Sequence, residues 1–159
     1  MLPSPIRESM SGGEGRIEAI WVKRAKRGVM DAVAMAELVP GEGVQGSADR
    51  RGKRQVTLIE REAWHAMMTE LSADVPPSAR RANVMLSGIR LAETRGRILR
   101  LGEARIRIAG ETKPCERMEE AWAGLQAAMR PAWRGGAFGE VITGGSISVN
   151  DVATWEETT

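Results

Sequence analysis

The hydrophobic and polar positions follow a short-strand pattern over most of the chain. In residues 16–22 (RIEAIWV), Ile17, Ala19 and Trp21 share one face, which is the alternation of a half-buried strand. Other runs typical of strands are Ala32–Val39, Arg54–Ile59, Asn83–Leu86, Ile98–Leu101, Ala104–Ala109, Gly139–Ile142 and Ser146–Val149. Gly102-Glu103 predicts one hairpin and Thr143-Gly144-Gly145 predicts a second. Such short strands, separated by Gly and Pro, predict a mainly β (α+β) fold in which an antiparallel or mixed sheet curls into a barrel-like domain.

Two segments have helical periodicity instead. The first places apolar side chains at i, i+3, i+4 and i+7 and predicts a helix over residues 60–71, with the stripe Trp64, Met67, Met68 and Leu71. The second predicts a helix over residues 116–130, closed by Pro131, with the stripe Met118, Trp122, Leu125 and Met129. We interpret both stripes as core rather than as a cofactor-binding surface, because such stripes normally pack a helix onto its sheet.

Length and composition limit the organisation to one domain. The chain has 159 residues, of which 42% are hydrophobic and 28% charged, a globular composition. Residues 1–15 are rich in Pro, Ser and Gly and are expected to form a flexible tail, residues 16–154 the domain, and residues 155–159 a short C-terminal tail. No apolar run reaches the roughly 18–20 residues of a membrane span, and the N-terminus lacks the apolar core of a signal peptide. We therefore expect a cytoplasmic protein without a membrane partner.

The charge distribution argues against nucleic-acid binding but permits a local basic pocket. The net charge is only +2, whereas residues 1–110 contain 19 Lys and Arg against 13 Asp and Glu. A dedicated DNA-binding protein usually carries a clear basic stripe. The dense run Lys23-Arg24-Ala25-Lys26-Arg27 is interpreted as a solvated loop.

Candidate chemistry gathers around Cys115. This single cysteine, with the single histidine His65, excludes a disulfide framework and an all-cysteine metal site. Cys115 lies between Lys113 and Arg117 and directly precedes the second predicted helix, a position that favours the thiolate, although nearby glutamates oppose it. A thiolate there could attack sulfur, carry a persulfide or bind a soft metal. A buried structural cysteine fits the spacing equally well.

A second group of candidate residues is basic. Arg80, Arg81 and Asn83 lead from a Pro-Pro loop into a strand, and Arg54 begins another strand. The rigid fork of an arginine fits phosphate oxygens, but adjacent arginines are more commonly a solvated rim. His65 is expected to be a partly exposed helix residue rather than a metal ligand or a catalytic base. The sequence contains neither a Gly-x-Ser-x-Gly elbow nor a glycine-rich phosphate loop, which disfavours serine hydrolases and nucleoside-triphosphate enzymes.

Several motifs, in order, resemble those of the MOSC domain, the module named after the C-terminal part of molybdenum cofactor sulfurases. PGEGVQG at residues 40–46 with KRQVTL at 53–58 is similar to the first signature, and RRAN at 80–83, with Gly88, Ile89 and Leu91, to the family's Arg-Arg-x-Asn segment. LGEA at 101–104, followed by Pro114-Cys115, resembles the hairpin and Pro-Cys region. RGG at 134–136 and GEV at 139–141, with Gly145 and Asp151, are similar to the closing hairpin. The resemblance extends from Gly15 to Ala153.

The resemblance implies a β-barrel with a few helices and a role in sulfur or molybdenum cofactor chemistry. It implies that Cys115 carries a persulfide or ligates molybdenum, and that Arg54, Arg80, Arg81 and Asn83 hold the pterin phosphate of the molybdenum cofactor (molybdopterin). Relatives include reductases of N-hydroxylated compounds, so a small molybdenum-dependent reductase with a redox partner is an alternative to a sulfur transferase. Pyridoxal phosphate belongs to the desulfurase half of the fused sulfurases, and no site for it is recognised here. Sulfur would therefore come from a partner such as a cysteine desulfurase.

The chain departs from the family pattern at two places. The family often has Gly-Asp-x-His after the first glycines, whereas Gly46 is followed here by Ser47-Ala48-Asp49. The usual Gly-Asp near the end is replaced by Asn150-Asp151. These departures keep open a second hypothesis, in which a degenerate domain retains the fold as a binding or scaffold module without catalysis.

Overall fold

Strand β1 (Glu14–Lys23) organises the sheet in the computed structural model, which describes residues 14–25, 28–48 and 52–157. Along one edge of β1, the first residues pair with β11 (Val152–Trp155) and the last with β2 (Met30–Val33). Along the other edge, β1 pairs with β6 (Val84–Ser87). Because one strand pairs with three others, β1 joins the two ends of the main sheet.

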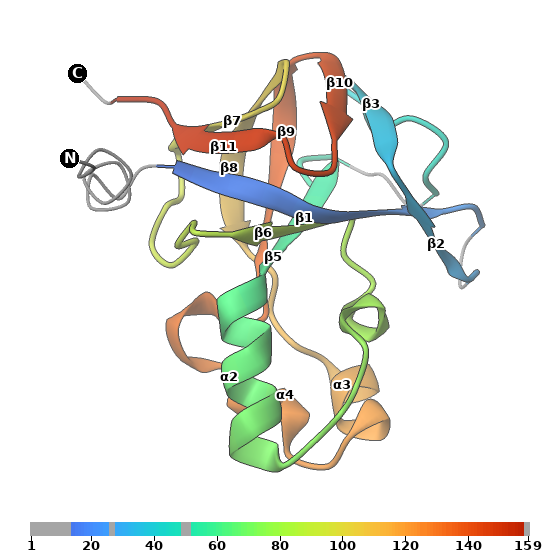
Figure 1. Cartoon of the computed structure of the whole chain (residues 1–159), viewed down its shortest axis with the longest axis vertical. Coiled ribbons are helices and arrows are strands. Elements are labelled where there is room, and N and C mark those ends of the chain that lie inside the picture. Colours follow the sequence, from blue (N-terminus) through green and yellow to red (C-terminus); the bar gives the residue numbers. More distant parts are fainter. Residues whose placement is uncertain (1–13, 26–27, 49–51, 158–159) are drawn as a thin grey trace, which may run out of the picture.

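The main sheet closes into a barrel (Figure 1). Its strands follow one another in the order β11, β7 (Ile98–Leu101), β8 (Ala104–Glu111), β9 (Ala137–Thr143), β5 (Val56–Glu60), β6 and β1, and the pairing of β1 with β11 closes the ring. Neighbours are antiparallel except β5 and β6, which are parallel. A small second sheet contains β10 (Gly145–Ser148), β3 (Met35–Val39) and β4 (Gly43–Val44). The predicted mainly β, barrel-like fold of mixed strand direction is confirmed.

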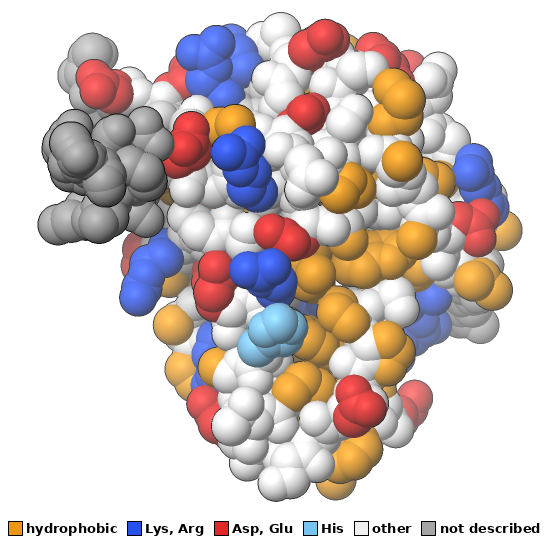
Figure 2. Space-filling view, in the orientation of Figure 1, with side chains coloured by type: hydrophobic (Ala, Val, Ile, Leu, Met, Phe, Trp, Pro, Cys, Tyr) orange, Lys and Arg blue, Asp and Glu red, His pale blue; other side chains and the backbone are white. Residues whose placement is uncertain are grey.

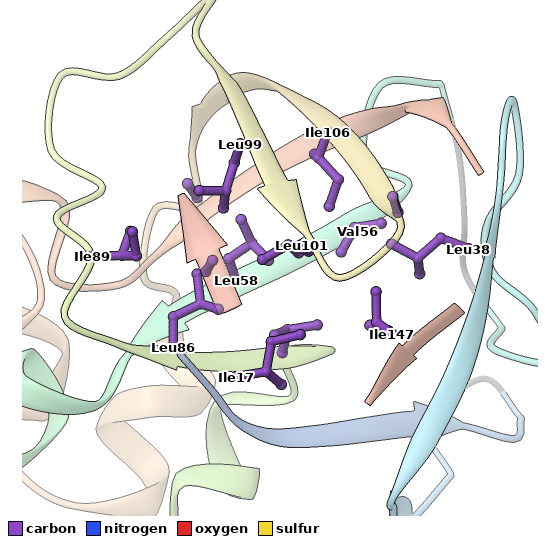
Figure 3. Packing of buried hydrophobic residues seen from close by; sticks show 14 of the residues in the cluster. Ile17, Leu38, Val56, Leu58, Leu86, Ile89, Leu99, Leu101, Ile106 and Ile147 are labelled. Atoms are coloured by element: carbon purple, nitrogen blue, oxygen red, sulfur yellow. The ribbon is translucent and has the colours of Figure 1, made fainter. Parts of the chain in front are cut away.

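The barrel interior is filled by aliphatic side chains from alternate strand positions (Figure 3). In β8, Ala104, Ile106 and Ile108 are buried, whereas Arg105 and Arg107 face outward, as the two-residue period of a strand requires. Leu58, Leu99 and Leu101 are likewise fully buried, together with other residues of the cluster labelled in Figure 3. Burying each such side chain contributes about 1.5–3 kcal/mol, so this core stabilises the closed ring.

The helices lie together at one end of the barrel (Figure 1). The parallel pair β5–β6 requires a crossover, which contains α2 (Arg61–Leu71) and the 3-10 helix η1 (Pro77–Arg80). Between β8 and β9 lie α3 (Glu116–Ala121), α4 (Leu125–Ala128) and η2 (Pro131–Trp133). The two groups share a second core made of Trp64, Met67, Met118, Leu125 and Met129. The interpretation of the Met and Trp stripes as core is confirmed for these residues.

The single helix predicted over residues 116–130 is wrong. Trp122 has an extended backbone and is 38% exposed, and Gly124 has φ of 91°, so the chain turns between α3 and α4. The carboxylate of Glu119 accepts hydrogen bonds from the backbone N–H groups of Gly124 (2.9 Å) and Gln126 (3.3 Å). The first N–H groups of a helix have no partner within the helix, and the Glu119 carboxylate satisfies two of them at the start of α4. The turn at Gly124 therefore divides the predicted helix into α3 and α4.

Two strand predictions also need correction. Residues 32–39 form two strands rather than one, because the carbonyl of Ala34 accepts from Val149 N–H (2.9 Å) and the chain passes from the barrel into the small sheet. The second predicted hairpin is absent from the described residues: β10 pairs with β3, whereas β9 pairs with β5 and β8. The Glu103 carboxylate also accepts from Ser146 N–H at 3.2 Å. The first hairpin, β7–β8, is confirmed.

The ends of the barrel extend slightly into the segments expected as tails. β1 begins at Glu14, and β11 ends at Trp155. Glu156 N–H then donates to the carbonyl of Ile98 at 2.9 Å. Residues 1–13 lie outside the described part of the chain. Within the described residues, no helix is both long and apolar enough to cross a membrane.

Truncation of the second core should destabilise the protein. Met67, on α2, is fully buried against the helices that follow β8. Met67→Ala should therefore lower the free energy of unfolding by about 2–5 kcal/mol. His65, the pale blue surface side chain in Figure 2, is exposed on the same helix, and His65→Ala should change it by less than about 0.5 kcal/mol. Chemical denaturation measures both values, and equal effects would contradict the placement of the helix.

Candidate functional site

The strand register brings three chain segments to the middle of β5. Leu58 is paired with Val84, the first residue of β6, and with Ala137, the first residue of β9. Ala137 is in turn paired with Glu111, the last residue of β8. The loops that precede β6 and β9 and the loop that follows β8 therefore meet. Arg80 and Arg81 precede β6, and Gly135 precedes β9. Thr112 to Cys115 belong to the loop that follows β8.

Arg80 connects these loops through backbone carbonyls. Its Nε donates to the carbonyl of Gly135 at 2.9 Å, and its Nη2 donates to those of Thr112 at 3.0 Å and Lys113 at 3.4 Å. The Thr112 N–H also donates to Gly136 O at 2.9 Å. The absence of a side chain at Gly135 permits this packing, because a Cβ there would lie 2.7 Å from the carbonyl oxygen of Thr112. Arg80 thus holds the loop that carries Cys115 against the start of β9.

The Arg80 guanidinium also interacts electrostatically with the site. Burial lowers its pKa, the negative charge of a Cys115 thiolate raises it, and the positive charge of Arg54 lowers it. Arginine remains protonated at neutral pH despite such shifts. Arg80 therefore supplies a partly buried permanent positive charge near the thiol, and an anion bound there would offset the cost of that burial.

A cavity of about 180 Å³ opens beside Arg80. Its charged lining side chains in the described part of the chain are all cationic: Lys23, Arg54, Arg80, Arg81 and Arg117. Cys115, Thr112 and Gly135 contribute to the same wall, and Thr57, Leu58, Ile59, Ala82 and Met118 complete it. Because the described lining contains five cationic side chains and no carboxylate, the cavity has a positive potential, which favours an anionic ligand.

Cys115 lies at the boundary between this cavity and open solvent. It is exposed, and together with Arg117 it also lines a shallow depression of about 520 Å³ with Glu116, Glu120 and Gln126. The thiol is therefore not the buried structural cysteine that the spacing left open. It can be reached from the depression while an anion occupies the cavity.

Thr112 has an unpartnered hydroxyl in the cavity wall. The residue is 7% exposed, and its Oγ1 makes no hydrogen bond with any described residue. Its backbone N–H and carbonyl are both bonded, to Gly136 and Arg80, so only the hydroxyl is unsatisfied. A buried polar atom without a partner is costly, and a group bound in the cavity that reached this hydroxyl would relieve the cost.

The four basic and amide residues singled out in the sequence have different roles. Arg54, Arg80 and Arg81 all line the cavity with Cys115. Arg54 lies over the ring of Phe138, 5.0 Å from its centroid, and Arg81 donates to the carbonyl of Gly28 at 2.7 Å. Asn83 is outside the lining.

The buried side chain of Asn83 joins strands instead. Its Oδ1 accepts from the Thr57 N–H at 3.1 Å, and its Nδ2 donates to the Trp21 carbonyl at 3.3 Å and to Ser47 Oγ at 3.4 Å. Ser47, which stands where the family often has an acid, thus belongs to this buried polar network.

Several lining residues were not singled out as site residues by the sequence, among them Lys23, Thr112, Gly135 and Arg117, which was noted only as a neighbour of Cys115. Lys23 belongs to the run interpreted as a solvated loop, but it lines the cavity at the end of β1. Lys26 and Arg27 of that run lie outside the described residues. Thr112 carries no charge and belongs to none of the motifs, whereas Gly135 lies in the Arg-Gly-Gly motif at residues 134–136. The Arg-Gly-Gly segment that contains Gly135 was the available signal, because paired glycines indicate a close backbone approach.

No cluster of three or more metal-ligating side chains occurs among the described residues. Cys115 is the one cysteine at the cavity, and the thioether of Met118 is the other sulfur in its lining. A metal held here would need most of its ligands from a cofactor.

A larger cleft of about 1000 Å³ lies elsewhere, between the start of α2, the loop after β6 and the end of β11. Its charges are mixed and partly paired, as in the ion pairs Arg134–Glu70 (2.7 Å) and Arg105–Glu156 (2.5 Å) at its border. It lacks the uniform charge of the cavity beside Cys115.

Replacing Arg80 by lysine should loosen the cysteine loop while keeping the charge. Lysine cannot reproduce the three-carbonyl contact, so Arg80→Lys should lower the free energy of unfolding by about 1–3 kcal/mol. It should also speed amide hydrogen exchange at residues 112–115. Arg130→Lys, at an exposed position outside the cavity lining, is the matched control. Unchanged exchange in Arg80→Lys would show that Arg80 does not hold the loop.

Comparison with known proteins agrees with this architecture. The family model described as the MOSC domain matches residues 26–154. The structure is similar to that of the YuaD protein from Bacillus subtilis, with a TM-score of 0.76, 17% identity, and coverage of 91% of this chain and 97% of that one. It is similar to YiiM from Escherichia coli, with a TM-score of 0.67, 19% identity, and coverage of 91% and 71%. For YiiM from Geobacillus stearothermophilus, the TM-score is 0.69, the identity 17% and the coverage 90% and 75%.

A search of curated proteins finds no match to this sequence. The structural similarities, all at low identity, concern the fold, whereas the match to the family model covers most of the chain. The chain belongs to the MOSC domain family.

Proposed function

We propose that this protein is a sulfur carrier in which Cys115 accepts a sulfane sulfur as a persulfide and passes it to an acceptor. The observation that carries the proposal is the position of the exposed thiol on the wall of a cavity whose described charged residues are all cationic. Sulfur transfer needs a thiol that a sulfur donor can reach, and the positive charges of the cavity wall attract an anionic donor to Cys115. A persulfide is likewise an anion and is stabilised by the same charges.

The two openings at Cys115 suit the two stages of such a transfer. The cavity holds the anionic part of a donor or acceptor against Arg54, Arg80 and Arg117. The depression on the other side leaves Cys115 reachable by a larger partner. A cysteine desulfurase is the expected partner donor, because no site for pyridoxal phosphate is recognised in this sequence. The reducing interior of a cell, where we expect the protein, would keep the thiol available.

The site also fits the molybdenum cofactor that the family implies, and this cofactor is the proposed acceptor or ligand. Arg54, Arg80 and Arg81 would hold its phosphate in the cavity, the unpartnered Thr112 hydroxyl would donate to an oxygen, and Cys115 would offer one soft ligand. The pterin rings would extend from the cavity toward the depression beside Cys115. When bound, the cofactor supplies a redox-active molybdenum. Asn83 has no place in this model, because its side chain is bonded to neighbouring strands.

Loading of Cys115 should depend on a supplied donor. Incubation with a cysteine desulfurase and free cysteine should add one sulfur, about 32 Da, to the wild-type chain, as seen by mass spectrometry. Reduction should remove this mass, and Cys115→Ser should not acquire it. Without the desulfurase, free cysteine should add nothing.

Two outcomes would contradict the carrier proposal. Sulfur added to Cys115→Ser would place the chemistry at another group. A wild-type chain that stays unmodified with every donor, while copurifying with molybdenum and pterin, would favour direct molybdenum ligation. If neither sulfur nor cofactor is found, the chain is a binding module that retains only the fold.

A further inference from the structure

The charge of the cavity restricts the group that can enter it. A water molecule occupies about 30 Å³ in the liquid, so a cavity of about 180 Å³ has room for a small tetrahedral oxyanion. Its described charged side chains are all positive. Such a wall does not favour the binding of an uncharged or cationic sulfur donor, whereas it attracts a small oxyanion.

Several hydrogen-bond donors of the wall are available to an oxyanion. The guanidinium groups of Arg54 and Arg117 make no hydrogen bond or ion pair with any described residue, although that of Arg54 lies over Phe138. Nη1 of Arg80 has no partner among the described residues, since that guanidinium donates to carbonyls through Nε and Nη2. Thr112, whose buried Oγ1 has no partner among the described residues, also lines the cavity and would add a hydroxyl donor if its side chain turned toward the ligand. Charge-assisted bonds from arginine to an oxyanion are strong and directional.

A thiol on the wall of an oxyanion cavity suits one class of sulfur donor. We propose that Cys115 takes sulfur directly from thiosulfonate anions, of which thiosulfate is the smallest, and that the cationic cavity binds their sulfonate end. The proposal rests on the sulfur-carrier function and names its low-molecular-weight donor. It assigns to this chain a thiosulfate sulfurtransferase activity that needs no desulfurase.

The transfer is balanced without an added oxidant or reductant. The Cys115 thiolate attacks the outer, sulfane sulfur of thiosulfate, and a new S–S bond forms between Sγ and that sulfur. The bond between the sulfane and sulfonate sulfurs breaks, and its electron pair leaves with the sulfonate group as sulfite. Arg54 and Arg117 stabilise the charge of the departing sulfite, and the hydroxyl of Thr112 donates to one of its oxygens. A nucleophile such as cyanide then removes the sulfane sulfur as thiocyanate and regenerates the thiolate.

The test is thiosulfate alone with the full-length protein. Wild type should release one sulfite for each sulfur gained by Cys115, and with cyanide added it should produce thiocyanate continuously. Cys115→Ser should do neither. Arg54→Gln and Arg117→Gln should each slow the reaction about tenfold or more, whereas Arg107→Gln and Arg130→Gln, outside the cavity lining, should not. Added sulfate should compete, and high salt should raise the KM for thiosulfate.

Thr112→Val provides a second variant that keeps the fold. Removing a buried hydroxyl that has no partner should leave the stability unchanged or higher. The same change should slow the reaction with thiosulfate several-fold while leaving alkylation of Cys115 by neutral iodoacetamide unchanged. Iodoacetamide also serves as the control for all arginine variants, because its rate reports how readily the Cys115 thiolate reacts with a reagent that has no anionic group.

The outcomes separate this proposal from the sulfur-carrier function. If a desulfurase loads Cys115 but thiosulfate does not, the thiosulfonate proposal is overturned and the carrier function stands. If neither donor loads Cys115, both fail. If thiosulfate reacts equally well with wild type and with the Arg54 and Arg117 variants, the cavity does not bind the donor, and the proposal is likewise overturned.

Discussion

The hydrogen bonds from Arg80 to the carbonyls of Gly135 and Thr112 are the interaction on which the site depends. They join the loop before β9 to the loop after β8 and use backbone oxygens that the barrel ladder leaves unpaired at its end. One guanidinium thereby satisfies several carbonyls, fixes the residues that lead to Cys115, and places a partly buried positive charge beside the thiol. Burying this guanidinium without a counter-charge is unfavourable, so the cavity beside it favours a bound anion.

The closed barrel supplies the rigidity that this arrangement needs. The parallel pairing of β5 with β6 and the antiparallel pairing of β5 with β9 set the start of two strands at the level of Leu58. A shift of register by one residue would turn the inward side chains of these strands outward, so the packed interior fixes the register and with it the site. The helical core built on Met67 and Met118 supports the loops from the side of the barrel end.

Local patterns predicted most of the fold, and longer-range effects explain the differences. The alternation in β8 and the apolar spacing in α2 need only neighbouring residues, and both elements form where they were expected. The break at Gly124 depends on the Glu119 carboxylate, and the pairing of β10 with β3 on distant contacts, which no local pattern contains. The same holds for the site. Family motifs led to Cys115, Arg54, Arg80 and Arg81, whereas the contribution of Thr112 and the structural use of Asn83 appear only when the strands are assembled.

The central claim is that the Cys115 thiol lies in the positive potential of the cavity, and a pair of alkylating reagents tests it directly. Iodoacetate and iodoacetamide react with thiols by the same displacement and differ in charge. The account predicts that, relative to a cysteine peptide, Cys115 favours iodoacetate over iodoacetamide by about tenfold at low salt, and that this preference declines as salt screens the cations. A ratio equal to that of the peptide, unaffected by salt, would contradict the claim.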